Sequence, residues 1–190
     1  MSYLFAGSIE HTMRDLFAPN SRAFSGFGGF HSLAPISEEA WREGLTTRFA
    51  ADDCAVDETA LDRLVELGEG HPRATMRIAQ QTHLRAVQLE TYDIGSDLVE
   101  LGYQAAMEGD KPIMEQTLSR IRAMHKDALA MVRAVAAGKP PPKHVTVGVR
   151  DRLLKQMRDA GIIEKVGHGR WRVINPLFRA YLQQSDELAS

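Results

Sequence analysis

The sequence lacks most of the features that would place it outside the ordinary globular class. It contains one cysteine, Cys54, in 190 residues, which excludes an intramolecular disulfide and a cysteine-rich zinc site. It has no run of about 18 apolar residues, so we expect no membrane span. No basic region precedes the first apolar residues, so we expect no secretory signal. Together these features lead us to expect a cytoplasmic protein.

Familiar catalytic motifs are also missing. The only Gly-Lys pair, Gly138-Lys139, is followed by Pro140, and Arg133 stands where the first glycine of a phosphate-binding loop would be. Neither G-x-S-x-G nor H-E-x-x-H occurs, and the seven histidines do not have metal-ligand spacing. We therefore predict no catalytic residues and no metal site within this chain.

The charge is unevenly distributed, although the whole chain carries a formal charge of only −2. Residues 1–138 hold 13 Lys and Arg against 20 Asp and Glu, a net charge of −7. Residues 139–181 hold 10 against 3, a net charge of +7, and the last nine residues add −2. The sequence therefore predicts a basic C-terminal module after an acidic body.

The acidic body reads as helical. We expect helices to begin near Ser37, Asp57, Pro72 and Ser96, because each start offers an N-cap acceptor or a first-turn proline. A further long helix is predicted from about residue 112 to 137, with His125 as a packed core residue. The apolar stripes expected to face the core are Trp41, Leu45 and Phe49; Leu61, Leu64 and Val65; Ala74, Ile78 and Ala79; and Leu98, Leu101 and Ala105.

The basic module follows a proline run that cannot continue a helix, at residues 138–142. Apolar residues at helical spacing then predict a helix around Leu153, and two strand-like runs flank Gly167-His168-Gly169 as in a β-hairpin. Asn175-Pro176 begins a last helix. Helix, helix and hairpin with a basic outer face is the plan of a winged helix-turn-helix. The residues expected to contact nucleic acid are Arg150, Arg152, Lys155 and Arg158 on the helix and Lys165, Arg170 and Arg172 on the wing.

The first 36 residues suggest part of a sheet. Tyr3-Leu4-Phe5-Ala6 is apolar without alternation, as in a strand that is covered on both faces. A second short strand is expected at about residues 30–33. The glycine- and phenylalanine-rich stretch at residues 24–30 is predicted to be a loop anchored by its aromatic side chains, with a ligand-binding loop as the alternative.

One local motif suggests an anionic partner. In Gly70-His71-Pro72-Arg73 the proline opens a helix, which places Arg73 in the first turn, where the helix dipole disfavours a cation. The motif therefore invites a search for a negatively charged ligand near Arg73. An ordinary surface arginine is the alternative.

Several short motifs occur in an order similar to that of one protein family. They are Tyr3-Leu4-Phe5-Ala6-Gly7-Ser8, residues 33–37, Gly70-His71-Pro72-Arg73, residues 160–164 and Asn175-Pro176-Leu177-Phe178. They resemble the sensor-1 strand, the crossing into the helical lid, the sensor-2 motif and the winged helix of STAND-like AAA+ ATPases from archaea and bacteria, which are related to origin-recognition and helicase-loader ATPases. That family usually has aspartate where Asn175 stands, and its Walker A and Walker B segments would lie before residue 1.

The resemblance implies a nucleotide site and a division into three parts. Arg73 and Ser8 would face nucleotide phosphates, and Arg22 lies in a region that carries an arginine finger in related ATPases. ATP with magnesium is the cofactor of the intact family, although this chain alone would not hold it firmly. The parts would be a remnant of the nucleotide-binding core (1–36), a helical lid (37–110) and a winged-helix domain with its long leading helix (111–190). The expected fold is thus mainly α with a partial α/β edge.

Three functions follow from these observations and stay open at this point. The chain could be an ATPase fragment that acts as a nucleotide-sensing switch, with a missing core or a neighbouring copy as its partner, because residues 1–36 supply at most two strands and should leave a sheet edge exposed. It could be a DNA-binding regulator, or its basic module could instead pack on the acidic body. It could also be a protein-interaction scaffold.

Overall fold

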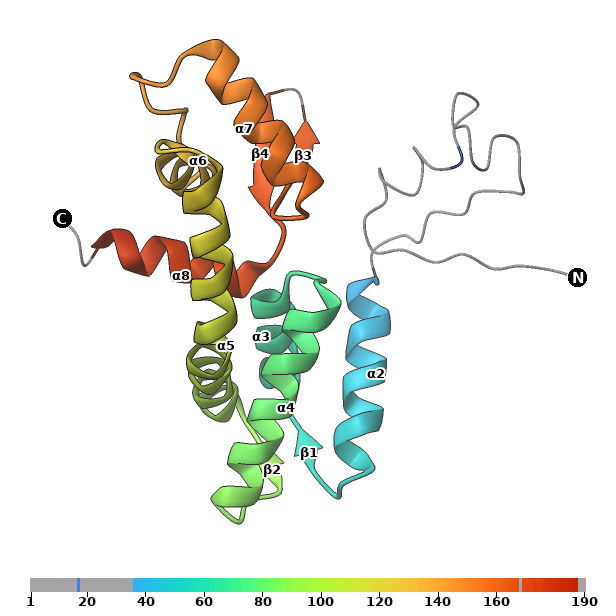
Figure 1. The fold of residues 1–190 in the computed structure, drawn as a ribbon. Helices are drawn as coiled ribbons and strands as arrows, with labels where there is room; N and C mark the ends of the chain where they lie inside the picture. The colour runs from blue at the N-terminus through green and yellow to red at the C-terminus, as the bar shows by residue number, and fades with distance from the viewer. Residues whose placement is uncertain (1–16, 18–35, 168, 188–190) are drawn as a thin grey trace, which may run out of the picture.

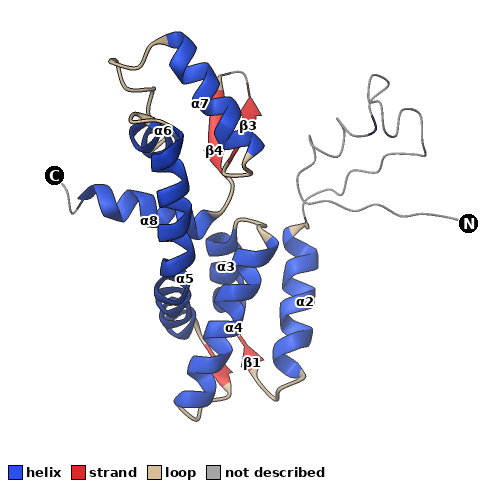
Figure 2. Ribbon diagram, viewed as in Figure 1, coloured by secondary structure: helices blue, strands red, loops and turns tan. Residues whose placement is uncertain are grey.

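The chain folds into a mainly helical structure with two very small sheets (Figures 1 and 2). The computed structural model describes Phe17 and residues 36–167 and 169–187. The strands expected at residues 3–6 and 30–33 and the loop expected at 24–30 lie outside the described residues. We use "helical body" for residues 36–124 and "C-terminal unit" for residues 128–187.

The helical body contains α2 (Glu38–Ala50), α3 (Glu58–Gly68), α4 (Pro72–Gln88) and α5 (Ser96–Met124). Their predicted starts are confirmed to within one residue. Ser96 is the first residue of α5 and not its cap, because Gly95 occupies the cap position without a side-chain hydrogen bond. The Ser37 hydroxyl accepts a hydrogen bond from the Ala40 amide, and the Asp57 carboxylate accepts one from the Ala60 amide, so each side chain satisfies an amide that the helix leaves unpaired. Pro72 occupies the first turn of α4.

Two short strands in the body were not predicted. β1 (Ala55–Val56) and β2 (Asp93–Ile94) pair in parallel and join the loop after α2 to the loop before α5. Each has only two residues, which is too short for any alternation of apolar and polar residues to be visible in the sequence. The pair fixes the start of α5 beside the start of α3, because Asp57 donates its backbone amide to the Ile94 carbonyl.

The predicted helix over residues 112–137 is wrong. α5 continues through Pro112 to Met124, and a separate helix, α6 (Ala128–Ala136), follows after a break. Pro112 is tolerated because it lies on the exposed side of α5, where the carbonyl group that loses its partner is open to water. The break comes at His125, which takes an extended backbone conformation instead of continuing the helix. The domain boundary expected at 110/111 therefore lies inside a continuous helix.

The face of α5 that packs on α4 also differs from the prediction. Leu98 is buried as expected, but Leu101 is 44% exposed and Gly102 and Ala106 are buried in its place. Gly102 lies so close to α4 that a Cβ atom there would come within 2.2 Å of Thr82 Oγ1 and 2.6 Å of the Thr82 backbone nitrogen. Apolar spacing alone could not reveal this contact, because a glycine makes it.

The C-terminal unit consists of α6, α7 (Val147–Asp159), a hairpin of β3 (Ile163–Gly167) and β4 (Arg170–Val173), and α8 (Pro176–Glu187). The predicted order of helix, hairpin and helix is confirmed. The hairpin is antiparallel with an irregularity between Lys165 and Gly167. Asn175 caps α8, since its side-chain oxygen accepts hydrogen bonds from the Leu177 and Phe178 amides.

One bidentate ion pair connects the body to the C-terminal unit. Arg179 of α8 donates both terminal guanidinium nitrogens to the Glu69 carboxylate, with Nη1 2.8 Å from Oε2. Glu69 is the residue that ends α3, and it has a left-handed backbone conformation with φ of 48°. The hydrogen bonds to Glu69 raise the pKa of Arg179, which strengthens the hold of the charged guanidinium on this carboxylate.

We predict that Gly102→Ala lowers the free energy of unfolding by about 1–3 kcal/mol or more, because the new methyl group overlaps α4 backbone. Gly44→Ala is the matched control in α2: a Cβ atom there meets nothing within 4 Å, so the change should stabilise the chain by up to about 1 kcal/mol. Urea unfolding monitored by circular dichroism checks both. Equal behaviour of the two variants would contradict the close α4–α5 contact.

Candidate nucleic-acid interface

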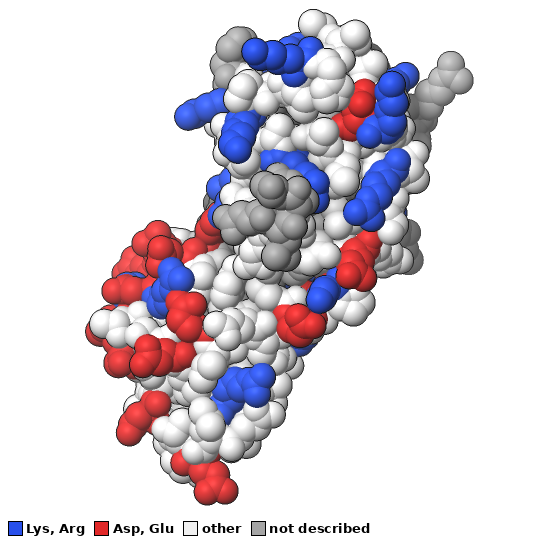
Figure 3. Space-filling model, turned by 90° about the vertical axis from the view of Figure 1, so that its left-hand side faces the viewer, with Lys and Arg blue, Asp and Glu red and all other residues white. Residues whose placement is uncertain are grey.

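The charge asymmetry of the sequence is also an asymmetry of the folded surface. Lys and Arg gather over the upper part of the molecule, at the height that α6, α7 and the hairpin occupy in Figure 1, whereas Asp and Glu gather over the lower part (Figure 3). The basic part therefore lies at one end of an elongated molecule.

The carboxylates of the basic module are all engaged by immediate neighbours. Asp151 accepts from Arg150 at 2.9 Å, Asp159 from Arg158 at 3.0 Å, and Glu164 from Arg172 at 2.6 Å. Lys155 also lies 3.5 Å from Asp159. Within the described part of the chain, the basic residues of the module that form no ion pair are Lys139, Lys143, Arg152, Lys165 and Arg170.

The acidic body does not neutralise these charges. Of the ten Lys and Arg in residues 139–181, Arg179 alone pairs with a carboxylate in residues 36–138, among the side chains that the structure describes. If the basic module packs on the acidic body, as the alternative predicts, that packing pairs one of its cations, Arg179, with a carboxylate of the described body. Among the described residues, the other nine cations of the module either pair with its own carboxylates or form no ion pair.

α7 presents two different faces. Leu153, Leu154 and Met157 are buried and hold the helix against the rest of the unit. Arg152 and Lys155 are exposed on the opposite side, as a recognition helix requires. The sequence prediction that basic residues lie on the outer face of this helix is met by these two, whereas Arg150 and Arg158 are half-buried beside their aspartates.

The hairpin also has an outer and an inner face. Glu164 lies opposite Arg172 on one face, and Lys165 lies opposite Trp171 on the other, together with the buried pair Ile163 and Val173. Side chains opposite each other in an antiparallel pair share a face. Trp171 and Lys165 thus face α6 and α7, and the Arg172–Glu164 pair faces away from them.

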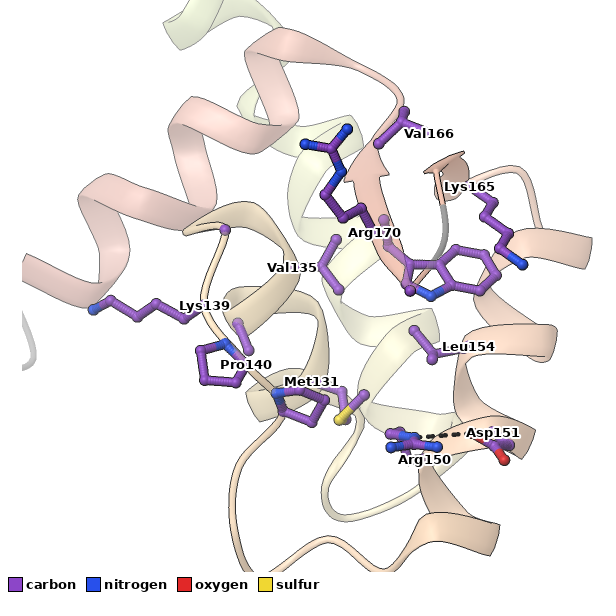
Figure 4. Close-up of a pocket in the computed structure, with 15 residues that line it drawn as sticks. Met131, Val135, Lys139, Pro140, Arg150, Asp151, Leu154, Lys165, Val166 and Arg170 are labelled. Atoms are coloured by element: carbon purple, nitrogen blue, oxygen red, sulfur yellow. Dashed lines mark hydrogen bonds and ion pairs between the residues drawn. The ribbon is translucent and has the colours of Figure 1, made fainter.

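A hollow of about 730 Å³ lies between α6, the proline segment, α7 and the hairpin (Figure 4). Its floor is apolar, formed by Met131, Val135, Leu154 and Trp171 together with two prolines. The charged residues that line it are Lys139, Lys165, Arg170 and the ion pair of Arg150 with Asp151. The sequence analysis did not find this hollow, because its residues come from four separate segments and no local spacing connects them.

Arg73 lies where the sequence predicted it, in the first turn of α4. Its partner in the described structure is Asp110 of α5, at 3.7 Å, and the same carboxylate is held more closely by Arg77 at 3.0 Å. Asp110 is buried, whereas the Arg73 side chain is 58% exposed. Arg77 is thus the main ion-pair partner of the buried Asp110 carboxylate, and the Arg73 side chain is accessible to solvent. Ser8 and Arg22, the other residues expected at a nucleotide, lie outside the described residues.

His71 caps α4. Its Nδ1 atom accepts a hydrogen bond from the Ala74 amide at 3.2 Å, which requires the neutral imidazole. Burial, with the nearby charge of Arg73, lowers the pKa of His71 below its ordinary value. The sequence showed Pro72 as the helix start but gave no sign that the histidine before it is the cap.

We predict that His71 makes stability depend on pH. Because its pKa is lower in the folded state, its contribution is present above the ordinary histidine pKa of about 6.5 and is lost as the pH falls from that value through the lower pKa of the folded state. His71→Asn keeps a cap that does not titrate. Between pH values of about 7.5 and about 5.5 on either side, wild type should lose up to about 1 kcal/mol of unfolding free energy relative to the variant. Parallel pH dependence of the two proteins would contradict this role.

Other kinds of site find no support in the described residues. No cluster of three His, Cys, Asp or Glu suitable for a metal ion is present among them. Cys54 is buried, and burial raises the pKa of its thiol. In the part of the chain with assigned structure, no helix combines the length and apolar character needed to cross a membrane.

Comparison with family models, with curated proteins and with solved structures gave no match.

Proposed function

We propose that the C-terminal unit is a winged helix-turn-helix that binds double-stranded nucleic acid, with α7 as the recognition helix and the β3–β4 hairpin as the wing. One observation carries the proposal: five basic side chains of the module have no ion pair in the described structure. Phosphate oxygens are natural partners for such charges.

We expect α7 and the wing to make different contacts with the duplex. A recognition helix lies in the major groove, and contacts to phosphates fix its position there. Arg152, Lys155 and Gln156 are exposed on α7, and arginine and glutamine can form paired hydrogen bonds with base edges. Lys165 and Arg170 of the wing would contact the sugar-phosphate backbone beside the groove.

We predict that Arg152→Ala with Lys155→Ala weakens duplex binding and also weakens its dependence on salt. Lys155, as a point charge, would contact a phosphate, so its loss should reduce the slope of log affinity against log salt by about 0.9. Loss of the Arg152 contact with a base edge should lower the affinity itself. Fluorescence anisotropy with a labelled duplex at several salt concentrations measures both quantities. The control is Arg48→Ala with Arg120→Ala, which removes two exposed cations of the body that form no ion pair within the described residues.

Two results of the anisotropy measurement would contradict the proposal. If wild type shows no anisotropy change at low salt, or if the two double variants lose affinity equally, the basic face of α7 is not a nucleic-acid interface. Retained helix content by circular dichroism shows that the variants are folded.

A second candidate, nucleotide sensing, rests on Arg73. Its exposed side chain at the N-terminal turn of α4 is placed as the AAA+ resemblance expects of a sensor-2 arginine, and the amides of a helix N-terminus favour anions. The helical body would then be the lid of an ATPase whose phosphate-binding loop lies outside this sequence, and Mg-ATP would be its ligand. One arginine cannot replace a phosphate-binding loop, so this chain alone should bind Mg-ATP weakly.

For this second candidate, we predict a weak calorimetric signal with Mg-ATP that Arg73→Ala abolishes. Arg77→Ala is the control, because it removes the closer partner of Asp110 but leaves Arg73 in place. The Arg77 variant should lose stability more than nucleotide affinity, since it leaves a buried carboxylate poorly paired. No signal with wild type, or equal loss of affinity in both variants, would count against a nucleotide site at Arg73.

A further inference from the structure

Two ends of the molecule carry exposed features of opposite charge. One is the cation-lined apolar hollow of the C-terminal unit described above. The other, which we term the apolar tip, is formed by Leu84, Val87, Leu89 and Tyr92 at the C-terminal end of α4 and in the loop that follows. All four side chains are exposed, Val87 by 60% and Tyr92 by 66%. A cluster of exposed apolar side chains of this kind is typical of an interaction site.

The tip is edged by acidic side chains. Glu90 and Asp93 are exposed in the same segment, residues 84–93, and neither forms an ion pair within the described residues. The one cation in the segment, Arg85, donates to Gln88 in its own helix. The tip is thus apolar with a negative edge, and the hollow is apolar with a positive edge, formed by Lys139, Lys165 and Arg170.

The two features cannot meet within one molecule. The tip adjoins the start of α5, and the hollow lies beyond its end, beside α6 (Figure 1). The C-terminal end of α4 lies at the bottom of the molecule, and α6, α7 and the hairpin lie at its top, with α5 between them (Figure 1). Any contact between tip and hollow therefore requires two copies of the chain.

We infer that the apolar tip of one copy docks in the hollow of another, so that the protein self-associates head to tail. The apolar tip side chains would cover the floor around Leu154 and Trp171, and Glu90 and Asp93 would face Lys165 and Arg170. The floor also distinguishes between occupants: it is mostly aliphatic with one half-buried aromatic ring, whereas a single nucleic-acid strand needs several aromatic faces for its bases. Aliphatic side chains fit it better.

The arrangement sets the symmetry of the assembly. Each copy offers one tip and one hollow, so the interface is heterologous, and it builds chains or closed rings instead of a two-fold dimer. The patches are small, and we therefore expect association that depends on protein concentration and weakens as salt screens the opposite charges.

A charge-swap experiment tests this inference in the absence of nucleic acid. Sedimentation velocity should show that the average mass of wild type rises from micromolar to millimolar concentration at low salt. The tip variant Glu90→Lys with Asp93→Lys and the hollow variant Lys165→Glu with Arg170→Glu should each remain monomeric. An equimolar mixture of the two should associate again, because each supplies the surface that the other has lost. This recovery also shows that both variants are folded.

The matched controls change the same number of charges elsewhere. Glu39→Lys with Glu43→Lys on α2 and Arg48→Glu with Arg120→Glu on α2 and α5 should associate as wild type does. The inference is wrong if wild type remains monomeric over the whole range, if the swap variants associate like wild type, or if their mixture stays monomeric. The nucleic-acid test at Arg152 and Lys155 is separate from this one, since neither residue lines the hollow. Lys165 and Arg170 would serve both partners, so a bound duplex should compete with the apolar tip.

Discussion

The close packing of α4 against α5 is the contact on which the rest of the structure depends. Gly102 of α5 brings the two backbones together at Thr82 of α4. Further along α5, Asp110 forms an ion pair with Arg77 of α4. Because α5 then continues without a break to Met124, the position of α4 determines where the C-terminal unit begins. The Glu69–Arg179 pair also holds the C-terminal unit against the helical body, because it joins α8 to the end of α3.

This construction explains why the two ends of the molecule differ in charge. The body uses many of its carboxylates on its own arginines: Arg42 pairs with Glu58 and Asp62, and Arg63 with Glu66 and Glu100. The C-terminal unit has only three carboxylates in residues 139–181, and neighbouring residues engage all of them. Its remaining cations form no ion pair within the described residues, and this is the basis of the proposed nucleic-acid interface.

Local signals in the sequence predicted the element starts well. Ser37, Asp57, Pro72 and Asn175 each mark a helix start that the structure confirms, because capping depends on residues only two or three positions apart. Long-range features escaped prediction. The break at His125 interrupts a stripe whose apolar spacing continues on both sides, and neither the Arg179–Glu69 pair nor the hollow beside Trp171 has any mark in the local sequence.

The central claim is that nucleic acid contacts α7 and the β3–β4 hairpin, and backbone amide shifts in a nuclear magnetic resonance titration test it most directly. With a short duplex added to the labelled chain at low salt, the account predicts that the largest shifts fall in residues 147–159 and 163–173, with α2 and α3 nearly unchanged. Shifts concentrated in α2–α4, or an unchanged spectrum at saturating duplex, would contradict it.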